Sequence, residues 1–187
     1  FQYEDRNKFY QLYSNKIDNI KPRVKKQFKS AYAALLELYK DVDFTAIATG
    51  APRSEEQRRE EIKKIDEKIL KQISSIKELE FKDEGLGIVK GFKEREAADV
   101  LAAAFFTPIQ FMETMIPARL TGGLSLIPQI AGPMYYDFNE QKALRLYGED
   151  DPKAFEKLVE NNETEILVPI IAAAGSIALE RIGLKSV

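Results

Sequence analysis

Residues 97–136, AADVLAAAFFTPIQFMETMIPARLTGGLSLIPQIAGPMYY, form the one long stretch of this 187-residue chain that is almost free of charge. Only Asp99, Glu113 and Arg119 carry charge in it, and prolines 108, 117, 128 and 133 and glycines 122, 123 and 132 interrupt it. A proline inside a helix costs roughly 3 kcal/mol, and a membrane-spanning helix needs about 20 uninterrupted apolar residues. The stretch therefore predicts short apolar helices and turns that are buried against other protein.

The composition is that of a globular protein, with 44% hydrophobic and 31% charged residues. The net charge of −2 gives the whole chain no attraction to nucleic acid. The absence of Cys excludes disulfides and thiolate metal sites, and the absence of His removes the commonest general base. The chain starts at Phe1 without a signal-peptide pattern. We expect it to be a fragment of a larger chain.

The first 50 residues predict a pair of amphipathic helices. Apolar residues recur at steps of three and four over residues 4–20, and Pro22 suits the first turn of a second helix. Six residues mark one apolar face of that second helix: Val24, Phe28, Ala31, Leu35, Leu38 and Val42.

Basic side chains gather between Lys16 and Lys29. The candidates for contact with phosphate or anionic lipid are Lys21, Arg23, Lys25, Lys26 and Lys29. A solvated helix face is the interpretation we favour, so contact of residues 16–29 with nucleic acid is an open but not a favoured alternative.

A long charged helix is predicted at about 54–80, within a segment that extends over 54–84. Ser54 and Gln57 have the spacing of a capping box at its start. A heptad pattern then defines a candidate interaction surface: Ile62, Ile65, Ile69, Gln72, Ile76 and Leu79. Because only about three heptads exist, we favour a helix packed on a neighbour in a bundle over a free-standing coiled coil.

Residues 97–187 form the apolar region and predict further short helices. A capping box at Asp137 and Glu140 predicts a helix that Gly148 ends, and Asp151-Pro152 predicts the start of another helix that runs to Asn161. The last helix is expected to begin at Pro169 and to stop at Gly183. No segment shows a long apolar–polar alternation, so we predict an all-α fold, an irregular multi-helix bundle.

No motif in the sequence carries recognisable chemistry. Gly85, Gly87 and Gly91 resemble a phosphate loop, but their spacing does not match the dinucleotide fingerprint and they follow a helix instead of a strand. Asp99 and Glu113 lie in apolar sequence, where desolvation raises a carboxyl pKa, but an ion-pair partner such as Arg119 is the ordinary explanation. We therefore predict no catalytic residue, no metal site and no cofactor.

Membrane insertion is a second alternative. Residues 97–136 and 166–184 combine apolar bulk with breaks, and small residues such as Ala172, Ala174 and Gly175 permit tight helix contact. Such segments can be masked in a soluble form and inserted later. The predicted helix from 169 to 182 would be only about 21 Å long, which is short of a hydrocarbon core of roughly 30 Å.

The tail VPIIAAAGSIALERIGLKSV resembles a pattern in the large internal virion proteins of tailed bacteriophages, which are carried in the particle and ejected with the genome. The resemblance covers about twenty residues and brings no functional residues with it. It implies a structural, cargo or ejection protein of the virion interior, whose partners are other virion subunits or copies of itself. The alternatives are a membrane-inserting or pore-forming helical protein that reaches the host membrane, and a helical spacer of a larger enzyme.

Overall fold

The structure, a computed structural model, describes residues 3–41, 44–86, 90, 93–94, 97–107 and 126–175. These residues contain helices and no strand, so the predicted all-α class is confirmed for the described part of the chain. The chain divides into two compact units. Unit 1 takes residues 1–25 and 79–125, and unit 2 takes residues 26–78 and 126–187. The units interleave along the sequence.

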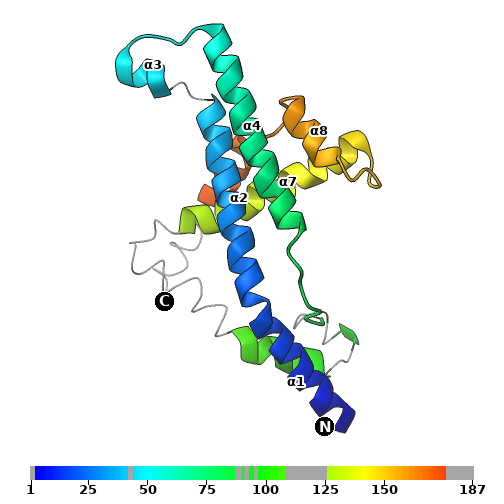
Figure 1. Cartoon of the computed structure of the whole chain (residues 1–187). Helices are drawn as coiled ribbons and strands as arrows, with labels where there is room; N and C mark the ends of the chain where they lie inside the picture. Colours follow the sequence, from blue (N-terminus) through cyan, green and yellow to red (C-terminus); the bar gives the residue numbers. More distant parts are fainter. Residues whose placement is uncertain are drawn as a thin grey trace. The chain divides into compact units, whose positions relative to one another are not determined.

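Unit 1 is built on α1 (Tyr3–Asp18), which packs against the helix at 97–107 (Figure 1). Phe106 is buried and meets Tyr13 edge to face at 6.4 Å between ring centroids, and Phe105 meets Phe9 at 5.9 Å. Leu12 is buried with them. Aromatic residues on one side of α1 thus supply much of the core of this unit.

Polar side chains of α1 and of the residue after it hold the extended segment 79–86. Asn19 pairs with Lys82 in both directions, since its amide donates to the Lys82 carbonyl and its oxygen accepts the Lys82 N–H, each at 2.8 Å. The Asp99 carboxylate accepts the Leu86 N–H at 2.6 Å and lies 2.6 Å from the Lys8 ammonium. Buried Asp99 is therefore a structural residue of this unit.

Unit 2 contains most of α2 (Ile20–Asp41), which crosses the unit boundary, together with α3 (Phe44–Thr49) and α4 (Glu55–Lys77). It also contains α7 (Leu126–Tyr147), α8 (Ala154–Glu160) and a last helix at 167–175. Isoleucines of α4 and aromatic and aliphatic residues of α7 and α8 form its core, among them Ile69, Tyr135, Phe155 and Leu158. The predicted Ser54–Gln57 capping box is confirmed, with both of its hydrogen bonds at 3.3 Å.

The prediction that Gly132 and Pro133 break the chain is wrong. Helix α7 runs without interruption from Leu126 to Tyr147, with Pro133 inside it, so the helix expected to start at Asp137 begins eleven residues earlier. Proline leaves one carbonyl of the preceding turn without its partner. The burial of Tyr135, Tyr136 and Ala143 on the same helix offsets that cost.

Two other boundaries differ from the sequence pattern. The last helix begins at Leu167 instead of Pro169, because the Glu165 carboxylate accepts the N–H groups of Leu167 and Val168 at its first turn. Helix α8 begins at Ala154 instead of directly after Asp151. The predicted stops of α7 at Gly148 and of α8 at Asn161 are confirmed. Glu113 and Arg119 lie outside the described residues.

Candidate interaction surface

The outward face of α2 carries large apolar side chains. Phe28 is 71%, Tyr32 46%, Leu35 60% and Tyr39 40% exposed. We name these four residues the α2 seam; all of them belong to unit 2. The sequence predicted Phe28 and Leu35 on one apolar face of this helix together with Ala31 and Leu38. Phe28 and Leu35 are exposed, whereas Ala31 is buried and Leu38 packs against the core of unit 2.

The opposite face of α2 is the buried one, and it is made of small and charged residues. Ser30, Ala33, Ala34, Glu37 and Lys40 are all buried there. Their spacing of three and four residues places them on one side of the helix. Small side chains on this side let another helix approach closely.

The close approach is made by α7 at Gly132. A methyl group added to Gly132 would lie 2.5 Å from the backbone nitrogen of Ala31 and 2.8 Å from its Cα. Only glycine therefore fits where α7 meets α2. The meeting of these two backbones explains why the bulky residues of α2 point away from the core.

A buried polar network fixes the rotation of α2 about its axis. Glu37, at 2% exposure, accepts the Tyr135 hydroxyl at 3.1 Å and the Thr164 hydroxyl at 2.7 Å. Lys40, at 6% exposure, lies 2.9 Å from Glu37 and 3.0 Å from Asp66 of α4. These bonds join α2 to α4, α7 and the segment before the last helix, so a turn of α2 that buried its seam would break them all.

Burial and the neighbouring charges shift the pKa values of this network. Burial acts to lower the pKa of Lys40, but its hydrogen bonds and charge interactions with Glu37 and Asp66 outweigh burial and raise that pKa above the usual value. Burial and the neighbouring Glu37 carboxylate raise the pKa of Tyr135, so its hydroxyl stays a donor. The network is therefore a fully partnered structural feature.

Asn139 of α7 continues the network toward the last helix. Its amide donates to the carbonyls of Tyr135 at 2.9 Å and Glu165 at 2.8 Å, and its oxygen accepts the Glu165 N–H at 2.7 Å. Because Asn139 is fully buried, these bonds fix the start of the last helix. No pattern in the sequence indicates this role.

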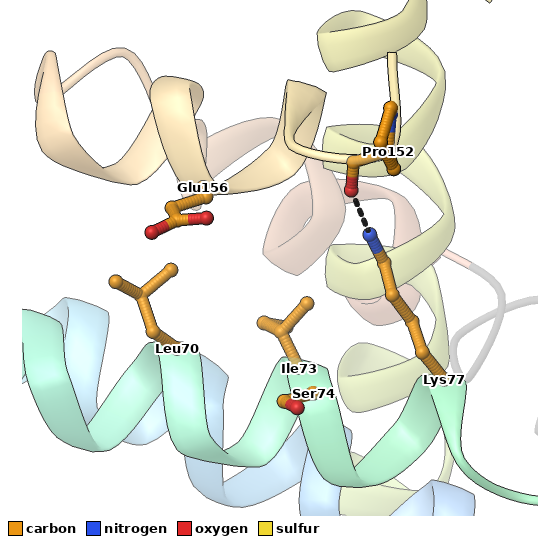
Figure 2. A pocket seen from close by; sticks show the side chains of 6 residues that line it. All are labelled: Leu70, Ile73, Ser74, Lys77, Pro152 and Glu156. Atoms are coloured by element: carbon orange, nitrogen blue, oxygen red, sulfur yellow. Dashed lines mark hydrogen bonds between the residues drawn. The ribbon is translucent and has the colours of Figure 1, made fainter. Parts of the chain in front are cut away.

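A pocket of about 310 Å³ lies between α4 and α8. It is lined by Leu70, Ile73, Ser74, Lys77, Pro152 and Glu156. Figure 2 shows the apolar side chains of α4 facing the helix that carries Glu156, while the Lys77 ammonium donates to the Pro152 carbonyl at 3.2 Å. Neither Glu37 nor Asp66 lines this pocket, so the buried charges and the pocket are separate features.

The residues of the predicted interaction surface of α4 differ in burial. Three of them are buried in the core of unit 2: Ile65, Ile69 and Ile76. Ile62 and Gln72 are half-buried, and Leu79 lies beyond the end of α4, in unit 1. Ile73, which the heptad pattern left out, is buried with the first three. Helix α4 thus packs on neighbours within the chain, and its buried isoleucines are not open to a partner.

The five predicted phosphate or lipid contacts differ in exposure and in the partners that they have within the chain. Lys21 and Lys25 are exposed and Lys29 is half-buried. In unit 1, Arg23 donates to Glu84 at 2.8 Å and lies 5.1 Å from the centre of the Phe106 ring. In unit 2, Lys26 bonds Asp137 at 3.2 Å and lies 4.9 Å from the centre of the Tyr136 ring. Two of the five cations therefore already have intramolecular partners.

Comparison with family models, with curated proteins and with solved structures gives no match for this chain. Across the described ranges, no helix is long and apolar enough to cross a membrane. Over the same residues, no cluster of three or more carboxylates could hold a metal ion. The α2 seam is the feature of the described chain on which we build a functional interpretation.

Proposed function

We propose that this protein is a non-enzymatic structural protein that works by packing helices against other subunits. The observation that carries this proposal is the α2 seam. Monomeric proteins expose single apolar residues freely, but a contiguous row of them marks a contact surface. Helix α2 directs Phe28 and Leu35 outward while Glu37 and Lys40 occupy its buried face.

The arrangement of the ionisable groups supports a structural role. Lys40 pairs with both Glu37 and Asp66, and Glu37 also accepts bonds from Tyr135 and Thr164. A catalytic acid or base needs a substrate within hydrogen-bond reach. These groups instead hold α2 in one orientation, which keeps the seam in place.

We place the protein in the interior of a tailed-phage particle, as a cargo component that leaves with the genome. The resemblance of the tail to internal virion proteins supports this setting. A contact surface on a helical protein suits it, because such proteins are packed against other subunits.

Particle proteomics tests the setting. Mass spectrometry of purified, genome-filled particles of the source phage should detect this chain, and particles that have ejected their genome should show less of it. A major capsid protein serves as the control that stays constant between the two samples. Absence of the chain from filled particles would contradict the proposed setting.

A dye-leakage assay tests the membrane alternative. We expect no leakage from vesicles of anionic lipid that are exposed to the purified chain. Leakage that is lost on Ala174→Glu would instead favour a membrane-inserting protein, since a carboxylate at an exposed position of the last helix opposes insertion.

A further inference from the structure

The four residues of the α2 seam follow the spacing of a coiled-coil contact. Phe28, Tyr32, Leu35 and Tyr39 are separated by four, three and four residues. This is the alternation of d and a positions, with an average repeat of about 3.5 residues, by which one helix meets another. The seam is therefore shaped for a helical partner.

A lipid surface fits the seam less well. A helix that lies in a membrane interface presents a wide apolar face and keeps its polar face in water. The seam is a narrow row, and the opposite face of α2 is buried in the core of unit 2. A single helix covers a narrow row of a and d residues.

A second copy of α2 complements the seam when it runs antiparallel. The two copies then place Phe28 opposite Tyr39 and Tyr32 opposite Leu35. Each pair of facing residues then contains one tyrosine together with a phenylalanine or a leucine, so the pairs are similar in volume. A parallel pairing would instead stack two leucines in one layer and two tyrosines in the layers on either side.

The net charge of the chain and the exposed area of the seam are both consistent with a reversible dimer. The net charge of −2 is too small for strong repulsion between two chains. The exposed part of the seam amounts to roughly 400 Å² per copy, which is about half of a standard stable interface. Association should therefore be weak and should depend on concentration.

We propose that two copies of this chain pair antiparallel through the α2 seam, with the twofold axis between Ala33 and Ala34. This inference rests on the proposed function, because it names the partner of the contact surface. The isologous arrangement makes each seam residue count twice, so one substitution removes two contacts.

Sedimentation equilibrium of the whole chain from about 10 µM to about 1 mM should show reversible dimerisation. Leu35→Glu should weaken it at least about tenfold, because the contact then holds two desolvated carboxylates. Ile171→Glu is the matched control, since Ile171 is at least as exposed as Leu35 but lies on the last helix, and it should leave dimerisation unchanged. A strict monomer over this range would overturn the proposal.

Disulfide trapping tests the direction of the pairing. The chain has no cysteine, so Tyr32→Cys and Leu35→Cys each introduce a single thiol. In a mixture of the two variants under mild oxidation, the disulfide between Cys at 32 and Cys at 35 should form faster than either homodimer. Faster homodimers would overturn the antiparallel arrangement.

The two proposals fail in different ways. A monomeric chain that is still found in filled particles would overturn the self-pairing alone. A monomeric chain in which Tyr32 cannot be iodinated would also overturn the self-pairing. That result would show that a segment of the same chain covers the seam. Absence from the particles would contradict the proposed setting and leave the measured dimer in place.

Discussion

At Gly132 the backbone of α7 lies close to the backbone of α2. Replacing it by alanine places a methyl group 2.5 Å from the Ala31 nitrogen, and neither backbone can move aside cheaply. We expect Gly132→Ala to lower the free energy of unfolding by about 1–3 kcal/mol, as overpacking does. Urea denaturation measures this loss.

Gly175 provides the matched control for that substitution. It is also a helical glycine, but a methyl group there meets nothing within 4 Å. Gly175→Ala should be neutral or stabilising by up to about 1 kcal/mol, because alanine is the better helix former. Equal losses for the two variants would show that contact with Ala31 does not cause the loss at Gly132.

Lys40 is the cation of the buried network, and its removal leaves the Glu37 carboxylate buried beside it. Lys40→Met should cost about 3–5 kcal/mol, the usual loss when one partner of a buried pair is removed. The exposed pair of Arg59 with Glu55 is the comparison. Arg59→Met should cost less than about 0.5 kcal/mol in the same denaturation experiment.

At the scale of the element, a capping box of two side chains stabilises the start of α4. The Ser54 hydroxyl accepts the Gln57 N–H, and the Gln57 side chain accepts the Ser54 N–H. Ser54→Ala should therefore lower stability by about 1 kcal/mol in thermal unfolding. Ser74→Ala, at an exposed interior position of the same helix, should raise stability by a few tenths of a kcal/mol. A loss at Ser74 as large as that at Ser54 would contradict the capping explanation.

Helix ends and helix faces differ in how far the sequence predicts them. The ends set by a local residue are predicted correctly, such as Ser54 for α4 and Gly148 for α7. The period of α2 is also correct, but a period does not say which side points inward. That choice depends on Gly132 and on Tyr135, which lie far along the chain.

The same reason explains why the candidate site was missed. Spacing placed Phe28 and Leu35 on one face, and apolar residues are usually the buried ones. Here Glu37 and Lys40 find partners on other elements, so their side of the helix is buried instead. Helix α7 continues through Pro133 for a similar reason. The burial of neighbouring α7 residues stabilises the helix by more than the proline destabilises it.

At the scale of the whole molecule, the two units should respond differently to acid. In unit 1, burial acts to raise the pKa of Asp99, but the Lys8 ammonium and the Leu86 N–H outweigh it and hold that pKa below its usual value of 3.8. Asp99 therefore stabilises the fold above about pH 3.8, and this stabilisation is lost as the pH falls through the lowered folded-state pKa. Unit 1 should loosen first on acidification.

Tryptophan reporters can follow each unit, because the chain has no native tryptophan. Tyr13→Trp reports on unit 1 and Tyr147→Trp on unit 2, since both tyrosines are half-buried. In a fluorescence titration below pH 4, the reporter at 13 should change at higher pH than the reporter at 147. Asp151 in unit 2 also has a lowered pKa, through its hydrogen bond with Lys157, but this pair is at the surface, where solvent screening keeps its effect small.

Asp99→Asn identifies the group responsible for the difference. Asparagine cannot titrate, so the variant should lose stability at neutral pH and should show less further change in unit 1 on acidification. The reporter at 147 should be unaffected, because Asp99 belongs to unit 1 alone. Coincident acid transitions at both reporters would contradict the assignment, since they would require one cooperative fold in which α2 transmits the loss of Asp99 to the network around Glu37.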